Sequence, residues 1–166
     1  ADAAAALRLL DRLWGLEAGE AALTALAAGL GADVPACLSS RTLLGEGRGD
    51  RLTPVELLGL AGKPVLLVNP RVPLATPPVF RGWDGIDRGP LSDWCGGRND
   101  LEAAAKALVP GIGEVLSALG DAEVARMSGS GATCFGLYAD PAARDAAAAR
   151  IGSAHPGWWC LATRLK

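Results

Sequence analysis

The sequence predicts an α+β fold. Short apolar runs of strand length alternate with alanine-rich stretches of helical spacing, and from residue 64 onward their order is strand, helix, strand, strand, helix, strand. This order is the split βαβ pattern of ferredoxin-like domains, in which we expect an antiparallel sheet with its helices on one face. Residues 1–60 do not fit that pattern, so we interpret them as the end of another domain and place the boundary between 1–60 and 61–166.

The first part of the chain predicts two helices, at 1–14 and 17–30. Leucines recur in both at helical spacing, and Gly31 is suited to cap the second helix at its C-terminus. Pro35 then prevents that helix from continuing, because a proline inside a helix removes a hydrogen bond and clashes with the preceding turn. Two strand-like runs are expected next, before a turn rich in glycine, at 36–38 and 41–44.

The second part predicts four strands, at 64–69, 124–127, 133–138 and 158–164. Thr76 followed by a proline is typical of a helix start, with Thr76 as the N-cap and the proline in the first turn. Asn99 predicts the cap of a further helix, which Pro110 divides, and a similar acid and proline open a last helix at 140–151. The glycine-rich stretch 82–98 predicts an irregular loop.

Composition excludes several classes of function. The 166 residues include 16 basic and 18 acidic side chains and form no basic patch, so we expect no nucleic-acid partner. We expect no membrane partner either, because no apolar run has the length of a bilayer span and no signal peptide is visible. The four cysteines form no close pair and His155 is the only histidine, so we expect no protein-held metal and free thiols in a reducing cytoplasm.

The strongest local pattern is Ser-Gly-Ser-Gly-Ala-Thr at 128–133, between two expected strands. Glycine lets the backbone turn sharply and lets a ligand approach it closely, and consecutive N–H groups in such a turn can form a concave site for an anion. A phosphate group would suit this loop. The alternative is a tight connection without a ligand, and no Gly-Lys-Ser/Thr follows as in a Walker loop.

Two further residues are candidates for a site. Asp33 lies in Gly-Ala-Asp-Val-Pro at 31–35, where an acid held at a helix end could take a proton from a substrate hydroxyl. Its alternative is an ordinary turn or capping aspartate, which the sequence alone favours. Phe80 could stack on a flat heterocycle, but docking of its ring into the core is the better interpretation from sequence alone.

Four runs occur in a set order along the chain: Gly-Ala-Asp-Val-Pro at 31–35, Gly-Glu-Gly at 45–47, Asn-Asp-Leu-Glu at 99–102 and Met-Ser-Gly-Ser-Gly-Ala-Thr-Cys-Phe at 127–135. This combination resembles the GHMP family of small-molecule kinases, and within it the kinases of 4-diphosphocytidyl-2-C-methyl-D-erythritol. The resemblance covers essentially the whole chain. It implies a GHMP kinase fold, with the end of the N-terminal domain at 1–60 and a ferredoxin-like C-terminal domain at 61–166.

The resemblance also implies an activity and a set of site residues. The family transfers the γ-phosphoryl group of ATP, with Mg²⁺, to the 2-hydroxyl of diphosphocytidyl methylerythritol, in cytoplasmic, non-mevalonate isoprenoid precursor synthesis. Asp33 matches the catalytic aspartate, and Phe80 matches an aromatic that stacks on the cytosine, with Thr76 in the adjoining substrate segment. The cofactor-binding residues that the resemblance implies are Ala1, at the end of the family's main ATP loop, and Gly129, Ser130 and Gly131.

We expect that the family's main ATP loop and its catalytic lysine would lie before Ala1, and that these 166 residues alone have no kinase activity. The physical reason is that such a lysine stabilises charge on the transferring phosphoryl group and keeps the aspartate ionised. A coupled ADP-release assay on the isolated chain checks this, and robust turnover would contradict it. We also expect the Asp33 carboxylate and the amides near Gly131 to converge on one cavity.

Three alternatives stay open at this point, one of which is a regulatory or degenerate kinase fragment. The first is another GHMP kinase, such as one acting on mevalonate or homoserine. The second is a ferredoxin-like binding module without catalysis, including an RNA-recognition domain, which would need exposed aromatics on its central strands and basic surroundings. Phe135 and Tyr138 fall on opposite faces of their strand and the net charge is −2, so the RNA alternative is the weaker one. The oligomeric state is left open.

Overall fold

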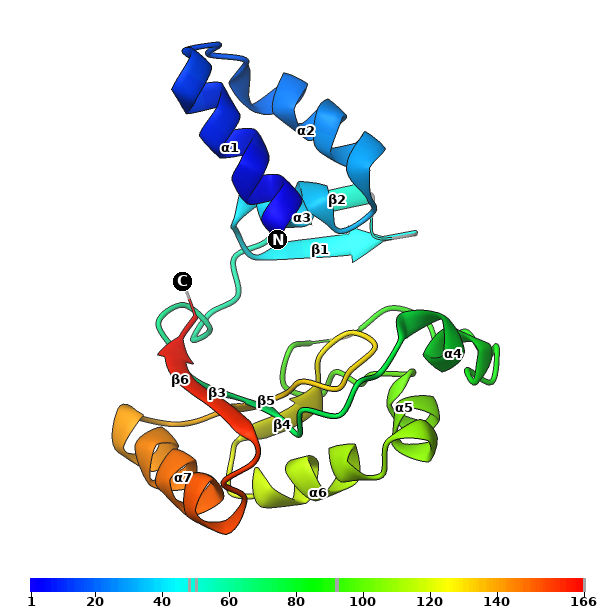
Figure 1. Ribbon diagram of the computed structural model, residues 1–166, viewed down its shortest axis with the longest axis vertical. Helices are drawn as coiled ribbons and strands as arrows, with labels where there is room; N and C mark the ends of the chain where they lie inside the picture. The colour runs from blue at the N-terminus through cyan, green and yellow to red at the C-terminus, as the bar shows by residue number, and fades with distance from the viewer. Residues whose placement is uncertain (48, 50, 92, 166) are drawn as a thin grey trace. The chain divides into compact units, whose positions relative to one another are not determined.

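The computed structural model describes residues 1–47, 49, 51–91 and 93–165, shown as a ribbon in Figure 1. Its internal contacts divide the chain into two compact units, Ala1–Leu58 and Gly59–Lys166, and each unit is described by itself. Among the described residues, no helix combines the length and the apolar character that a membrane crossing requires.

The first unit consists of helices followed by a hairpin. Its elements are α1 (Asp2–Trp14), α2 (Gly19–Leu30), α3 (Val34–Ser39), β1 (Leu43–Glu46) and β2 (Arg51–Pro54). A small core forms where Ala4, Ala27 and Leu38 are buried between the three helices. Arg8 donates from its guanidinium to the carbonyls of Cys37 and Leu38, which satisfies acceptors that the end of α3 leaves unpaired.

Two local predictions for this unit are wrong. The segment 36–38 was expected as a strand and instead belongs to α3, because Pro35 lies in the first turn of that helix. There the missing N–H costs no hydrogen bond and the fixed φ suits the helix. The strand expected at 41–44 begins at Leu43 and runs to Glu46, and its partner β2 was not predicted.

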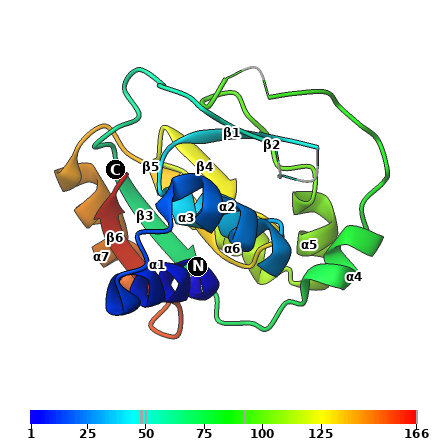
Figure 2. The same cartoon turned by 90° about the horizontal axis from the view of Figure 1, so that it is seen from above.

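The second unit has the predicted alternation of strands and helices. Its elements are β3 (Pro64–Asn69), α4 (Thr76–Arg81), α5 (Glu102–Leu108), α6 (Gly111–Ala118), β4 (Val124–Met127), β5 (Cys134–Leu137), α7 (Pro141–Ala154) and β6 (Trp159–Arg164). The strands form one sheet in the order β4-β5-β3-β6, and every neighbouring pair is antiparallel. Figure 2 shows this order across the sheet. The predicted α+β, ferredoxin-like architecture is confirmed.

The two faces of this sheet carry different clusters. Leu66 and Val68 of β3 join the main core, which also takes buried residues from α4, α5, α6 and α7. Val65 of the same strand lies in a second cluster with Val124 and Leu137, and the rings of Phe135 and Trp94 pack against that cluster. Successive side chains of a strand point to opposite faces of the sheet, so the main core lies on one face only. The helices cover that face, as Figure 1 shows for α6 and α7.

The predicted helix caps were partly right. Asp140 accepts a hydrogen bond from the Ala143 amide at 2.8 Å and so caps α7, as expected. Thr76 is not the N-cap of α4, because Ala75 holds that position and Thr76 is already helical. The Oδ1 atom of Asn99 accepts a hydrogen bond from the Leu101 amide at 3.0 Å. Asn99 is nevertheless not the N-cap of α5, because Leu101 holds that position.

Tyr138 provides a test of the core. Its side chain is 1% exposed, and the hydroxyl has no hydrogen-bond partner among the described residues. We predict that Tyr138→Phe raises the free energy of unfolding by about 1 kcal/mol, because it removes a buried polar group that makes no bond. Urea denaturation followed by tryptophan fluorescence checks this, with Ile151→Val as the control, which should lower stability by about 1 kcal/mol.

The same substitution has a pH signature. Burial raises the pKa of the Tyr138 phenol from its ordinary value of 10.0 to about 12. Between those values the folded chain keeps the proton that the unfolded chain loses, so this group reduces stability as the pH rises through that window. The advantage of Tyr138→Phe should therefore grow with pH there. An unchanged difference would contradict the assignment of a buried, unbonded phenol.

Candidate active site

The glycine-rich loop at 128–133 connects β4 to β5 in a tight, hydrogen-bonded turn. The Ser128 amide donates to the Thr133 carbonyl at 2.9 Å, and the Gly131 amide donates back to the Ser128 carbonyl at 3.0 Å. Gly129 and Gly131 have φ values of 53° and 86°, which side chains with a Cβ rarely adopt. Among the described residues, no acceptor is found for the Gly129, Ser130 and Ala132 amides. Ala132 is buried, so the Gly129 and Ser130 amides are the donors available to an anion.

Gly131 is the residue of this loop that packing restricts most. A Cβ added there would lie 2.9 Å from the Met127 Sδ, 3.2 Å from Leu74 Cδ2 and 3.4 Å from Ile112 Cδ1. A Cβ added at Gly129 would meet nothing within 4 Å. The two glycines share a left-handed backbone, but only Gly131 is also pressed against its neighbours.

Asn99 ties the loop to the segment ahead of α5. Its Nδ2 donates to the Met127 carbonyl at 2.9 Å and to the Gly129 carbonyl at 2.8 Å, while its Oδ1 accepts from the Leu101 amide. One side-chain amide thus holds carbonyls at two points of the loop. The sequence predicted only a capping role for Asn99. A capping asparagine uses its oxygen and leaves two N–H donors unassigned, and those donors were the signal that a further partner existed.

Hydroxyl and amide groups support the loop from its other side. Thr76 Oγ1 and Ser130 Oγ lie 2.9 Å apart and share a hydrogen bond, which joins the first residue of α4 to the centre of the loop. Asn69, at the end of β3, donates to Thr133 Oγ1 at 2.8 Å. The structure therefore brings together four of the expected site residues, Thr76, Gly129, Ser130 and Gly131. Sequence spacing alone did not predict the Thr76 contact.

Phe80 lies one turn further along α4. Its side chain is 55% exposed, so the interpretation that its ring docks into the core is wrong. Val79 takes that place in the core and is fully buried, because helical spacing turns it toward the sheet. The ring of Phe80 is free to meet a ligand.

The remaining expected site residues belong to the first unit. Asp33 precedes α3 and is exposed, and its carboxylate makes no capping hydrogen bond. Its backbone carbonyl accepts from the Cys37 amide at 3.1 Å, which is the first turn of the helix. Ala1 precedes α1 in the same way, with its carbonyl bonded to the Ala5 amide. Each unit is described by itself, so convergence of Asp33 with the glycine loop stays a prediction.

Relatives of known family resemble the chain over its whole length. A family model described as GHMP kinases C terminal matches residues 86–157. A 4-diphosphocytidyl-2-C-methyl-D-erythritol kinase of Rhizorhabdus wittichii is 53% identical over 100% of this chain and 60% of the relative. A protein of the same name from Sphingopyxis alaskensis is 50% identical over 100% of this chain and 62% of the relative. Residues 86–157 thus match the GHMP kinase C-terminal family, and the chain resembles proteins named for one kinase over its whole length.

A solved structure has a similar fold. The crystal structure of a 4-(cytidine 5'-diphospho)-2C-methyl-D-erythritol kinase is 34% identical, with a TM-score of 0.78, and the match covers 97% of this chain and 63% of that one. The chain therefore spans somewhat less than two thirds of the length of the relatives it matches. The resemblance that the sequence runs indicated is confirmed.

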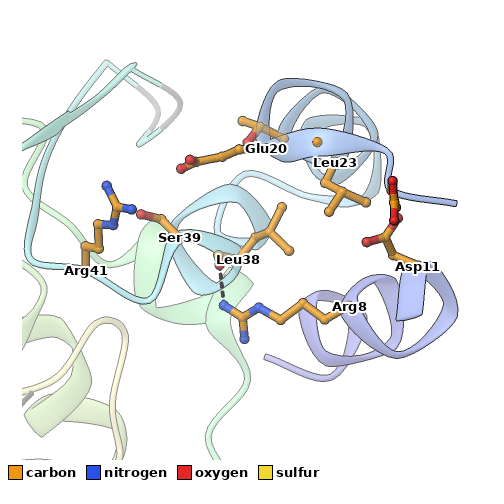
Figure 3. A pocket seen from close by; sticks show the side chains of 10 residues that line it. Arg8, Asp11, Glu20, Leu23, Leu38, Ser39 and Arg41 are labelled. Atoms are coloured by element: carbon orange, nitrogen blue, oxygen red, sulfur yellow. Dashed lines mark hydrogen bonds between the residues drawn. The ribbon is translucent and has the colours of Figure 1, made fainter. Parts of the chain in front are cut away.

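A cavity of about 510 Å³ lies between the helices of the first unit. Arg8, Asp11, Glu20 and Arg41 surround it, as Figure 3 shows, with the Arg8 guanidinium bonded to Leu38. Of the described residues that line it, none is among the expected site residues. Its mixed charges partly compensate one another, so the cavity favours neither an anion nor a cation.

Proposed function

We propose that this chain is part of an enzyme that transfers the γ-phosphoryl group of ATP to the 2-hydroxyl of 4-diphosphocytidyl-2-C-methyl-D-erythritol, in non-mevalonate isoprenoid precursor synthesis. The observation that carries the proposal is the 53% identity, over 100% of the chain, to a relative named for this kinase activity. The glycine loop with its unpaired amides adds an independent chemical reason, because phosphate oxygens are the acceptors such amides suit.

In this proposal Asp33 accepts or orients the proton of the substrate hydroxyl. A general base has to be within hydrogen-bond reach of that proton, and a carboxylate already used as a helix cap would be less available. The Asp33 carboxylate has no capping bond to the α3 amides, so both oxygens are available to a substrate. The unit Ala1–Leu58 would then be the remainder of the N-terminal domain, with Ala1 at the end of the main ATP loop.

The loop at 128–133 would receive the phosphates of ATP. Its amide donors stabilise the negative charge that the phosphate oxygens carry during transfer, and they are fixed in place before the nucleotide binds. ATP supplies the phosphoryl group. Its phosphates are also the usual ligands of Mg²⁺ together with one or two carboxylates, and no cluster of three metal-ligating side chains occurs in the described part of the chain. We therefore propose that Mg²⁺ binds with the nucleotide.

Phe80 would contact the base of the substrate, with Thr76 in the adjoining segment. We predict that Phe80→Ala raises the KM for the diphosphocytidyl alcohol about 3- to 10-fold, because stacking of two aromatic rings is worth roughly 0.5–1.5 kcal/mol. The KM for ATP should stay the same. Steady-state kinetics of the full-length enzyme check this, with Phe80→Tyr as the control that keeps the ring. Equal increases in both KM values would contradict the stacking role.

The experiment that tests the proposed function compares acceptors. The full-length protein is incubated with ATP and either the diphosphocytidyl alcohol or mevalonate, and phosphorylated products are identified by mass spectrometry. We expect phosphorylation of the diphosphocytidyl alcohol alone. Turnover of mevalonate instead would favour another GHMP kinase, and no turnover with either would leave the catalytic proposal without support.

A cytoplasmic location accords with the four cysteines, which are all free thiols.

A further inference from the structure

We propose that Asn99 is a positioning residue for the glycine loop, holding it in the shape that binds the phosphates of ATP. The proposal rests on the proposed function, since it names the part of the protein that prepares that loop. Asn99 is 28 residues away in sequence from Met127 and 30 from Gly129, the two residues whose carbonyls it contacts. It lies outside the run 128–133 and touches the loop only through backbone groups.

The contacts of Asn99 fix the orientation of its side-chain amide. The nitrogen faces two carbonyl oxygens at 2.9 and 2.8 Å, and the oxygen faces the Leu101 N–H at 3.0 Å. Turning the amide over would place its oxygen against two other acceptors and its nitrogen against a donor. All three hydrogen bonds can form only in the observed orientation, so the Asn99 side chain is a clamp whose N–H donors face the loop.

The polarity of this clamp suits an anion site. A loop that binds phosphate has to present N–H groups and keep its carbonyl oxygens away from the negative charge. Asn99 donates hydrogen bonds to the carbonyls of Met127 and Gly129, and the Gly131 amide donates to the carbonyl of Ser128. The carbonyls of three successive residues, Met127, Ser128 and Gly129, are therefore bonded within the protein. The amides of Gly129 and Ser130 stay available.

A neighbouring asparagine offers a matched control. Asn69 donates to the hydroxyl of Thr133, which can reverse its role and donate to a carboxylate. Asn69→Asp therefore keeps a hydrogen bond, whereas Asn99→Asp places a carboxylate against two carbonyls that cannot donate. Both substitutions add one negative charge beside the same loop, so a difference between them isolates the loss of the two donors.

The experiment measures ATP binding by the full-length protein with isothermal titration calorimetry, together with both KM values. We expect Asn99→Asp to weaken ATP binding about tenfold or more, since two hydrogen bonds are lost and each changes an equilibrium several-fold. Asn69→Asp should change it about twofold or less on the same scale. The KM for the alcohol should change little in either variant. If Asn99→Asp fails to fold, Asn99→Ser, which keeps one donor without a charge, should give an intermediate loss.

The outcomes separate this inference from the proposed function. Wild-type affinity in Asn99→Asp, or equal losses in the two aspartate variants, overturns the role of Asn99 while kinase activity stands. A parallel rise in the KM for ATP and for the alcohol also overturns it, because that is what general damage to the fold produces. Tenfold weaker ATP binding supports the inference even if the diphosphocytidyl alcohol is not phosphorylated. A wild-type protein that does not bind ATP overturns both.

Discussion

Replacing Gly131 with alanine is expected to lower the free energy of unfolding of the second unit by about 2–5 kcal/mol. A left-handed backbone costs an alanine roughly 1–2 kcal/mol, and overpacking a filled core costs a further 1–3 kcal/mol. The backbone φ at Gly131 is 86°, and the new methyl group would lie 2.9 Å from the Met127 sulfur and 3.2 Å from Leu74. ATP binding should weaken as well, because the loop has to shift to relieve these contacts.

Gly129→Ala is the matched control for this prediction. It places the same methyl group at a φ of 53° in the same loop, but with nothing within 4 Å. Its cost should be about 1–2 kcal/mol, which is the backbone contribution alone. Urea denaturation of both variants, followed by tryptophan fluorescence, gives the comparison. Equal losses would mean that the packing around Gly131 yields more easily than its distances indicate.

Asp33→Asn is expected to reduce the kcat of the full-length enzyme by roughly 10²- to 10⁴-fold, the usual range for loss of a general base. Asparagine has the same size as aspartate but cannot accept the hydroxyl proton. The stability of the protein should change by less than about 0.5 kcal/mol, because Asp33 is exposed and its carboxylate makes no capping bond to α3. Activity would therefore be lost without loss of the fold.

The control for Asp33 is an aspartate that also stands before a helix and a proline. Asp140 does so, and its carboxylate accepts from the Ala143 amide, so Asp140→Asn keeps an oxygen that can cap α7. We expect that variant to retain wild-type kcat and stability. The measurements are steady-state kinetics and thermal denaturation. If Asp33→Asn keeps more than about a tenth of the wild-type kcat, proton transfer by this residue is contradicted.

Much of the second unit could be predicted because its elements carry strong local signals. The strand Pro64–Asn69 was predicted within its observed bounds, since prolines lie at or next to both of its ends and its interior is apolar. α3 was missed because Pro35 was taken as a stop, although a proline is equally suited to the first turn of a new helix. β2 was missed because Leu52 is its only large apolar residue, which gives no alternating apolar pattern. Its pairing with β1 makes it a strand.

The candidate site could be predicted in its residue types but not in its connections. The glycines of the loop predicted a sharp turn of the backbone, and Gly129 and Gly131 make it in the left-handed region. The hydrogen bond between Thr76 and Ser130 joins residues 54 positions apart, and no local pattern encodes such a contact. Phe80 was misjudged because a single aromatic at a helix start has no periodicity that tells an inward ring from an outward one.

The position of β3 has a consequence for how the protein is made. It is the first strand of its unit, yet it pairs along its whole length with β6, the last strand in the sequence, and on its other side with β5. During synthesis on the ribosome, the N–H and C=O groups on this edge of β3 stay unpaired until β6 has emerged, and unpaired edges of this kind promote aggregation. Chains interrupted before Trp159 would leave that edge bare, so we expect them to be substrates for chaperones and proteases.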